Sequence, residues 1–517
     1  MDKSLILAID NGTQSLRALL FDKHGQIQGK SQIFYNPYDQ PAPGYCEQDP
    51  EVYWHALGEA CQQLWLDGHK PGTVAAITVT SQRSSLVPVD ERGTALMKAV
   101  IWLDQRKAKN LKPMSIVWRS VFKVLGLSST VVSFREKALS NWLYDHNPQL
   151  LKKVHKWLFL SGYLNFKLTG EYRDSRASQV GYVPFDYKKQ CWGGGLDWKW
   201  QALAMNPNQL PELIDSGNTM GLLTTEAAAA CGLEPSVPVI ASGADKACEV
   251  LGSGGVSPDV ACLSFGTTAT VNVCSPRYRE VVKHIPAYPA VLSGHFCYEA
   301  MLFRGFWMVS WFKEQFGLEE SQRVLDADGS VEALFDELVD AVPAGSMGLV
   351  LQPYWGAGLR EPGPEAKGAV IGFGDVHKRE HLYRSILEGL VFGLLEGFEK
   401  IQKRCGVNPT ILRVSGGGSQ SNAAMQIAAD VFGMPAERPH TSETSGLGAA
   451  IAVATGLGWY DDMEQAVTQM VHPGDVFQPN PANHEIYQHL YRDVYLKMYP
   501  KLQPLYSRIR EITGYPE

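Results

Sequence analysis

The chain has 517 residues, of which 45% are hydrophobic and 20% are charged, and its formal net charge is −7. This length exceeds what one hydrophobic core usually serves, so two domains are expected. The acidic balance argues against nucleic acid as a partner, because nucleic-acid-binding proteins carry a basic stripe. No apolar stretch reaches the length needed to cross a membrane, so no membrane partner is expected.

Nine cysteines are scattered along the chain, and no two of them form a Cys-x-x-Cys pair. The N-terminal apolar run, Leu5 to Ile9, meets Asp10 and is too short for a signal peptide. An odd, dispersed set of cysteines without an export signal indicates free thiols and a cytoplasmic location. The same spacing argues against a zinc site.

Residues 4–35 are expected to form three consecutive strands. Apolar residues 5–9 end at Asp10, a Gly-Thr turn follows, and residues 16–21 resume the apolar pattern. Glycine at the tip lets the backbone approach a ligand closely, and hydroxyl groups add donors beside the exposed amides. The turn and its flanks contain Gly12, Thr13, Ser15 and Arg17.

The same layout returns later in the chain, where residues 260–263 lead into a second Gly-Thr turn and residues 270–273 resume the apolar pattern. One such turn alone is most simply an ordinary glycine turn. Two facing turns suit a phosphate chain gripped between two domains, and Asp10 adds a carboxylate where a phosphate-bound Mg²⁺ would lie. The tip residues of the second turn are Gly266, Thr267 and Thr268.

Apolar spacing predicts a helix over residues 50–67 and buried strands over residues 74–79 and 86–89. Residues 134–169 are expected to be mostly helical, and residues 186–206 to form an irregular loop.

Two polar side chains, Gln82 and Arg83, come directly after the strand over residues 74–79. Ligands of α/β sheets gather at the carboxyl ends of the strands, which favours a binding role for these residues. The alternative for Arg83 is a solvated surface arginine.

Asp245 follows a buried strand over residues 237–241 and precedes a helix that runs to Leu251. An aspartate at a helix start can serve simply as the N-cap. At a strand end that faces a cleft, the same carboxylate suits a general base, because phosphoryl transfer needs a group that accepts the proton of the attacking hydroxyl.

Glycine-rich residues 252–255 mark a predicted boundary between domains 1–253 and 254–517. In both halves strands come first and helix–strand alternation follows. This order favours an α/β fold of two duplicated domains with a cleft between them. The helices expected in the second half lie near residues 306–317, 331–341, 377–404, 422–432 and 445–454.

Three consecutive glycines follow a strand predicted over residues 411–414. They form either a tight turn or a flat backbone surface for adenine and ribose, and their position after the second phosphate turn favours the nucleotide. No Gly-x-x-x-x-Gly-Lys-Ser/Thr pattern is present, which excludes a P-loop as the ATP site. The candidate nucleotide residues here are Gly416, Gly417, Gly418 and Asn422.

Taken together, these motifs resemble the FGGY carbohydrate kinases, a branch of the superfamily of actin, sugar kinases and heat-shock chaperone ATPases. Residues 10–17, 264–268 and 414–422 are similar to the family's first phosphate, second phosphate and adenosine loops. Residues 368–388 resemble its C-terminal signature, although Phe373 replaces the usual aliphatic residue. The resemblance implies two ribonuclease-H-like domains of the actin and hexokinase type, related by duplication, with an interdomain cleft.

The resemblance also implies roles for individual residues. Asp245 occupies the place of the family's catalytic aspartate, and Asp10 would hold Mg²⁺ through water. ATP would bind mainly to the C-terminal domain, with its phosphates between the two turns. The residues implied for ATP are Gly12, Thr13, Ser15, Arg17, Gly266, Thr267, Thr268, Gly416, Gly417, Gly418 and Asn422.

The candidate substrate residues depart from the known subgroups. Glycerol kinases carry Gln-Arg-Glu where this chain has Gln82, Arg83 and Ser84, and xylulokinases carry a Met-His pair there. Lys246 replaces a family Gln or Asn, which suggests a substrate with a carboxylate or extra oxygens unless it is a surface helix residue. Trp102 either stacks on substrate carbon, as the resemblance implies, or packs in the core.

The resemblance predicts an ATP-dependent kinase that phosphorylates a small carbohydrate: a pentulose, a polyol or a sugar acid. It also suggests a homodimer, because members of the family often form dimers. The alternatives are a catalytically inactive sensor that binds sugar or nucleotide, and another ATPase of the actin superfamily.

Overall fold

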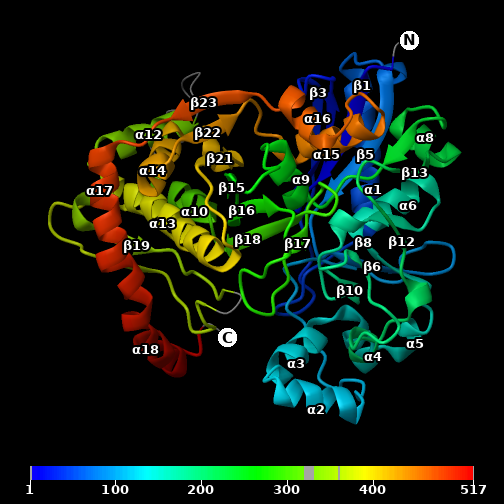
Figure 1. Ribbon diagram of the computed structural model, residues 1–517, viewed down its shortest axis with the longest axis horizontal. Coiled ribbons are helices and arrows are strands. Elements are labelled where there is room, and N and C mark those ends of the chain that lie inside the picture. The colour runs from blue at the N-terminus through cyan, green and yellow to red at the C-terminus, as the bar shows by residue number, and fades with distance from the viewer. Residues whose placement is uncertain (1–2, 319–330, 359–360, 516–517) are drawn as a thin grey trace.

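The computed structural model describes residues 3–318, 331–358 and 361–515, and it contains two α/β domains that lie side by side (Figure 1). Each domain is built on a mixed β-sheet with helices on its faces.

The N-terminal sheet has six strands in the order β13-β14-β5-β1-β2-β3. Strands β1, β2 and β3 form an antiparallel meander, while β5 pairs with β1 and β14 in parallel. Every residue of β5 is buried, because helices cover both faces of the sheet at this strand. The bounds are β1 Leu5–Asn11, β2 Ser15–Phe21, β3 Ile27–Phe34, β5 Val74–Ser81, β13 Thr219–Leu222 and β14 Pro238–Ile240.

The C-terminal sheet has seven strands in the order β17-β18-β16-β15-β21-β22-β23. Again, three strands (β15, β16 and β18) pair antiparallel, two further strands continue in parallel, and an antiparallel strand closes that edge. The seventh strand, β17, pairs antiparallel with β18 at the other edge. This repeated topology confirms the prediction of two duplicated α/β domains. The bounds are β15 Val260–Phe265, β16 Ala269–Ser275, β17 Tyr288–Pro289, β18 Phe296–Leu302, β21 Ile411–Ser415, β22 Ala436–Pro439 and β23 Pro473–Phe477.

Helices surround both sheets. Those of the N-terminal half are α1 Pro50–Leu66, α2 Ile116–Val124, α3 Ser128–Lys137, α4 Leu139–His146, α5 Pro148–Leu151, α6 Leu160–Thr169, α7 Lys199–Ala202, α8 Thr225–Cys231 and α9 Asp245–Gly252. Those of the C-terminal half are α10 Trp307–Phe316, α12 Val331–Asp340, α13 Arg379–Cys405, α14 Asn422–Phe432, α15 Thr444–Gly456, α16 Met463–Met470, α17 Pro481–His489 and α18 Leu496–Thr513.

Smaller sheets complete the structure. In the N-terminal half a four-stranded sheet in the order β4-β7-β6-β8 shares a buried cluster with helices α3 and α4, and its strands β6 and β8 lie right of centre in Figure 1. The short strands are β4 Glu47–Gln48, β6 Leu86–Val89, β7 Ala99–Val100, β8 Lys156–Phe159, β9 Arg173–Ser175, β10 Phe185–Asp186, β11 Cys191–Trp192, β12 Glu212–Ile214, β19 Val350–Gln352 and β20 Ala369–Ile371.

Strand β8 interrupts the segment 134–169, which the sequence predicts to be mostly helical. It pairs antiparallel with β6, with Leu86 opposite Phe159. A run of a few apolar residues fits a strand or a helix equally well by periodicity, and here pairing with a distant strand decides the conformation.

Helices α15 and α16 belong to the C-terminal half of the chain but pack on the N-terminal sheet, as Figure 1 shows. Ile6 and Leu19 of this sheet share one buried cluster with Leu447 and Ile451 of α15. The two halves are therefore joined by a common hydrophobic core.

Helices α9 and α15 cross with their backbones in direct contact. A Cβ atom at Gly448 would lie 1.8 Å from the carbonyl oxygen of Cys248, and one at Gly252 would lie 2.0 Å from that of Thr444. Since backbone atoms cannot move aside as a flexible side chain can, only glycine fits these two positions.

All nine cysteines are free thiols, which confirms the prediction from their spacing. Among the described residues, no helix combines the length and apolar character needed to cross a bilayer.

We predict that Gly448→Ala lowers the free energy of unfolding by about 2–3 kcal/mol, because the added methyl group must push α15 away from α9. The measurement is the midpoint of urea-induced unfolding. Gly58→Ala in α1 is the matched control, since a Cβ atom there would lie 3.4 Å from its nearest neighbour. That substitution should stabilise the protein by about 0.5–1 kcal/mol. Equal stability of the two variants would contradict the proposed contact.

Candidate active site

The first Gly-Thr turn joins β1 to β2 and is held by hydrogen bonds on both sides. The Gly12 amide donates to the Ser15 carbonyl at 3.0 Å, and the Tyr35 hydroxyl donates to the Gly12 carbonyl at 2.7 Å. Gln32 donates to the Ser15 hydroxyl at 2.9 Å. The turn is therefore a rigid element at the end of the N-terminal sheet.

Three predicted site residues from separate segments meet at this turn. The Thr13 hydroxyl donates to Gln82 Oε1 at 3.0 Å, and the Trp102 indole donates to the Thr13 hydroxyl at 3.1 Å. Gln82 also donates to the Tyr53 hydroxyl at 3.2 Å. The structure thus brings the first Gly-Thr turn together with two of the candidate substrate residues.

Asp10 is only 6% exposed and accepts a hydrogen bond from Arg17 Nη1 at 3.2 Å. Burial raises the pKa of Asp10 to about 6, with Arg17 opposing the rise and the carboxylates of Glu443 and Asp245 adding to it. Arg17 also approaches Glu443, which in turn accepts a hydrogen bond from Lys30 at 2.6 Å. A phosphate contact of Arg17 stays a prediction, because here its guanidinium faces carboxylates.

Asp10 and Asp245 fit a magnesium ion that is bound together with phosphate. Among the described residues, no cluster of three or more His, Cys, Asp and Glu side chains could hold a metal ion. Mg²⁺ bound to nucleotide needs only one or two protein carboxylates, since water and phosphate oxygens supply the other ligands. Asp10, with Asp245 close enough to raise its pKa, offers such a set.

The second Gly-Thr turn joins β15 to β16 and is braced from behind by the segment 303–306. The Phe306 amide donates to the Gly266 carbonyl at 3.0 Å, and the Gly305 amide donates to the Thr267 carbonyl at 2.9 Å. The Thr268 hydroxyl donates to the Phe303 carbonyl at 3.4 Å.

The triple glycine follows β21 and lies against the second turn. Gly416 has φ +84°, and a Cβ atom there would lie 2.9 Å from the carbonyl carbon of Phe265. A Cβ atom at Gly418 would lie 2.3 Å from the Phe306 ring, whereas Gly417 faces open space. The candidate nucleotide loops are therefore neighbours.

Asn422 begins helix α14, as the sequence predicts. Its side-chain oxygen accepts a hydrogen bond from Arg438 Nη2 at 2.7 Å, and Arg438 Nε donates to the Ser419 carbonyl at the same distance. Arg438 thus fixes the end of the triple-glycine loop, a role that no sequence motif indicates.

Asp245 is the first residue of α9, and the N-cap position belongs to Ala244, which makes no side-chain capping bond. Asp245 Oδ1 accepts from the Lys246 amide at 2.7 Å. Burial raises the pKa of Asp245 above its ordinary value, while the charges of Arg83 and Lys246 lower it. Asp245 is therefore not the N-cap residue of α9, although its carboxylate accepts from one amide of the first turn.

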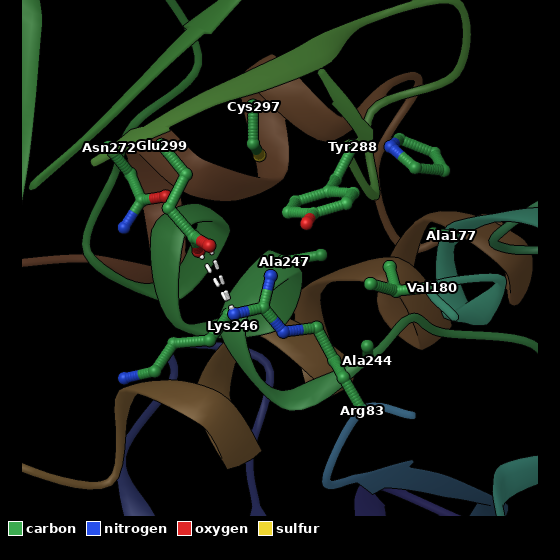
Figure 2. Close-up of a pocket in the computed structure, with 11 residues that line it drawn as sticks. Arg83, Ala177, Val180, Ala244, Lys246, Ala247, Asn272, Tyr288, Cys297 and Glu299 are labelled. Atoms are coloured by element: carbon green, nitrogen blue, oxygen red, sulfur yellow. Dashed lines mark hydrogen bonds and ion pairs between the residues drawn. The ribbon is translucent and has the colours of Figure 1, made fainter. Parts of the chain in front are cut away.

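A pocket lies between the two halves of the chain (Figure 2). Its polar lining comes from both halves and includes Arg83, Lys246, Asn272, Tyr288 and Glu299.

Arg83 and Glu299 form an ion pair across this pocket, with 3.1 Å between Nη2 and Oε2. Figure 2 shows the two side chains extended toward each other from opposite halves. The Arg83 guanidinium also lies 5.2 Å from the centre of the Tyr288 ring. Arg83 is therefore a pocket residue and not a solvated surface arginine.

Lys246 extends away from this ion pair in Figure 2. Its Nζ atom donates to Glu249 Oε2 at 2.5 Å, one turn further along α9. Lys246 lines the pocket with its stem, so its predicted contact with substrate stays a prediction.

Sequence reasoning missed Glu299 and Tyr288, which no motif contains. The one available signal is a charged residue inside the apolar strand β18, Phe296–Leu302, because an acidic side chain in a half-buried strand needs a partner.

Two domain families match the chain: residues 5–252 match the N-terminal domain of the FGGY family of carbohydrate kinases, and residues 261–457 match its C-terminal domain. The chain is 29% identical over 497 residues to the xylulose kinase of Lactococcus lactis. The aligned region covers 94% of this chain and 95% of that protein. The chain is 26% identical over 498 residues to an autoinducer-2 kinase of Escherichia coli, with 94% and 92% covered.

Solved structures share the fold. The ligand-bound xylulose kinase of Lactobacillus acidophilus superposes with a TM-score of 0.82 at 21% identity and covers 98% of this chain and 99% of that chain. Gluconate kinase from the same organism gives 0.81 at 22% identity, covering 98% and 100%. Glycerol kinase of Plasmodium falciparum with ADP gives a TM-score of 0.75 at 17% identity and covers 96% of this chain and 98% of that chain. With both of its domains matched by the family models, the chain belongs to the FGGY family of carbohydrate kinases.

Proposed function

We propose that this carbohydrate kinase transfers the γ-phosphoryl group of ATP to a hydroxyl of a small sugar or polyol, with Asp245 as the general base. The observation that carries the proposal is the place of Asp245. Its carboxylate stands at the first residue of α9, where the charge of Arg83 lowers its pKa and where it in turn raises the pKa of Asp10.

The proposed reaction assigns a task to each part of the cleft. The sugar enters the pocket beside Arg83, and its attacking hydroxyl gives its proton to Asp245. The two Gly-Thr turns hold the phosphates, and the triple-glycine loop holds the nucleoside. Mg²⁺, bound with the nucleotide near Asp10, neutralises charge on the phosphates. Closure of the two halves excludes water, which would otherwise compete with the sugar as the attacking group.

The pocket favours a neutral polyhydroxy substrate, a pentulose or a polyol, over a sugar acid. Arg83 is paired with Glu299, and Lys246 is paired with Glu249, so both cations already have a carboxylate partner. A paired guanidinium and carboxylate offer donors and acceptors to hydroxyl groups without an unbalanced positive charge.

Glu299 also compensates for the departure at Ser84. In glycerol kinases a glutamate follows the arginine at this place. In this chain the next residue is Ser84, which has φ +60° and donates to the Val180 carbonyl at 2.9 Å. Glu299 supplies a carboxylate to Arg83 from the opposite half of the chain. The relatives named xylulose kinase add support for a pentulose.

We predict that Asp245→Asn lowers kcat by about 10²–10⁴-fold, the usual range for removing a general base. The measurement is ADP release from MgATP with glycerol, erythritol, pentitols, ribulose, xylulose and gluconate in turn. ATP binding without stimulation by any sugar would favour the inactive sensor. ATP turnover that ignores both the sugars and the substitution would favour another ATPase of the superfamily.

The acid limb of the kcat–pH profile should lie above the ordinary pKa of aspartate, because Asp245 must be ionised to accept a proton and burial raises its pKa. Arg83→Met should move this limb to higher pH, since the positive charge of Arg83 lowers the pKa of Asp245. Arg92→Met, in an exposed turn, makes the same charge change and should leave the limb in place. A limb unmoved by Arg83→Met would argue against Asp245 as the base.

Glu299→Gln should raise KM for the preferred neutral sugar about tenfold, since a hydrogen bond to a charged group contributes roughly 1.5–3 kcal/mol. It should also shift the ratio of kcat/KM values toward gluconate, because Arg83 loses its carboxylate partner. Steady-state kinetics with both substrates measure the shift. Wild-type protein that prefers gluconate would overturn the proposal of a neutral substrate.

A further inference from the structure

The helix that carries Asp245 also carries a nearly buried ion pair that the proposed reaction does not use. Lys246 Nζ lies 2.5 Å from Glu249 Oε2, and the two side chains are 20% and 10% exposed. The spacing of three residues places both on one face of α9.

This ion pair contacts both nucleotide loops. Lys246 Nζ donates to the Ser264 hydroxyl at 2.8 Å, and the Ser415 hydroxyl donates to Glu249 Oε1 at 2.7 Å. Ser264 lies two residues before Gly266, and Ser415 directly precedes Gly416. The two serines are also opposite each other in the parallel pairing of β15 and β21. The ion pair therefore contacts each loop at the end of the strand from which the loop begins.

We propose that Lys246 and Glu249 are positioning residues, which fix Asp245 relative to the ATP loops. The inference rests on the proposed function and deepens it. Charge-assisted hydrogen bonds in a buried network hold one geometry, and a displacement of about 1 Å at a reacting centre can cost on the order of 10²-fold in rate. Asp245 begins the same helical turn, so any movement of the pair moves the base.

The competing role for Lys246 is direct contact with the substrate. Two features favour the positioning role: the Lys246 ammonium already donates to Glu249 and Ser264, and Figure 2 shows it extended away from Arg83 and Glu299. The two roles predict different kinetics. A positioning residue affects kcat equally for every sugar, whereas a substrate ligand changes KM for some sugars more than for others.

The test compares Lys246→Gln and Glu249→Gln with the double variant that carries both substitutions. We expect each single variant to lower kcat at least about tenfold, by the same factor for every accepted sugar, with sugar KM values within about twofold of wild type. The double variant should lose no more activity than the worse single variant, because the two residues act as a unit. A changed order of sugar preference, or kcat values near wild type, would overturn the proposal.

Ser415→Ala is a milder variant that removes the link from Glu249 to the adenosine loop, together with a 3.3 Å contact to the Leu263 carbonyl. It should weaken binding of the non-hydrolysable analogue β,γ-imido-ATP several-fold in calorimetry and leave sugar KM unchanged. This binding experiment needs no turnover, so it tests the link even if a charge variant fails to fold. An unchanged affinity for the analogue would count against the proposal.

Glu388→Gln in α13 is the matched control, because Glu388 also forms a buried ion pair within one helix, with 2.8 Å to Arg384 Nε. It should lower the unfolding midpoint but leave kcat unchanged. Wild-type protein that phosphorylates no sugar would defeat the proposed function. Wild-type turnover together with unchanged Lys246 and Glu249 variants would defeat only the positioning role.

Discussion

The contact between α9 and α15 is the constraint on which the rest of the structure depends. Gly252 and Gly448 let the two backbones touch, and the helices come from opposite halves of the chain. Helix α9 carries Asp245 at its start, while α15 is packed on the N-terminal sheet. The position of the proposed base is therefore set by backbone packing, which is far stiffer than any side-chain contact.

Charge balance in the cleft is the second organising feature. Arg83 and Lys246 each meet one carboxylate and Arg17 meets two, and two of these four carboxylates, Glu299 and Glu443, come from the C-terminal half. Buried charges are tolerated only when they are paired, so each pair that joins the two halves also constrains how the halves fit together. The cleft is thus polar and rigid without a large excess of either charge.

The sequence alone predicts those parts of the fold and of the candidate site that depend on local chemistry. Gly12, Gly266 and Gly416 are in turns that need glycine or a close approach, and the helix from Asn422 follows its apolar spacing. Glu299 and Tyr288 could not be found, because their partner Arg83 lies over two hundred residues away in the chain. The sequence motifs indicate Lys246 as a cation and do not indicate its partner, although the helical spacing of Glu249 is a signal for this ion pair.

The place of α15 and α16 has a consequence for synthesis on the ribosome. The apolar face of the N-terminal sheet, with Ile6 and Leu19, is covered by residues that end at Met470. At translation rates of about 5–20 residues per second, this face waits roughly 10–45 s after α9 has been made. During that interval the nascent chain exposes an apolar surface that is prone to aggregate. The protein should therefore depend on chaperones while it is being made rather than after its release.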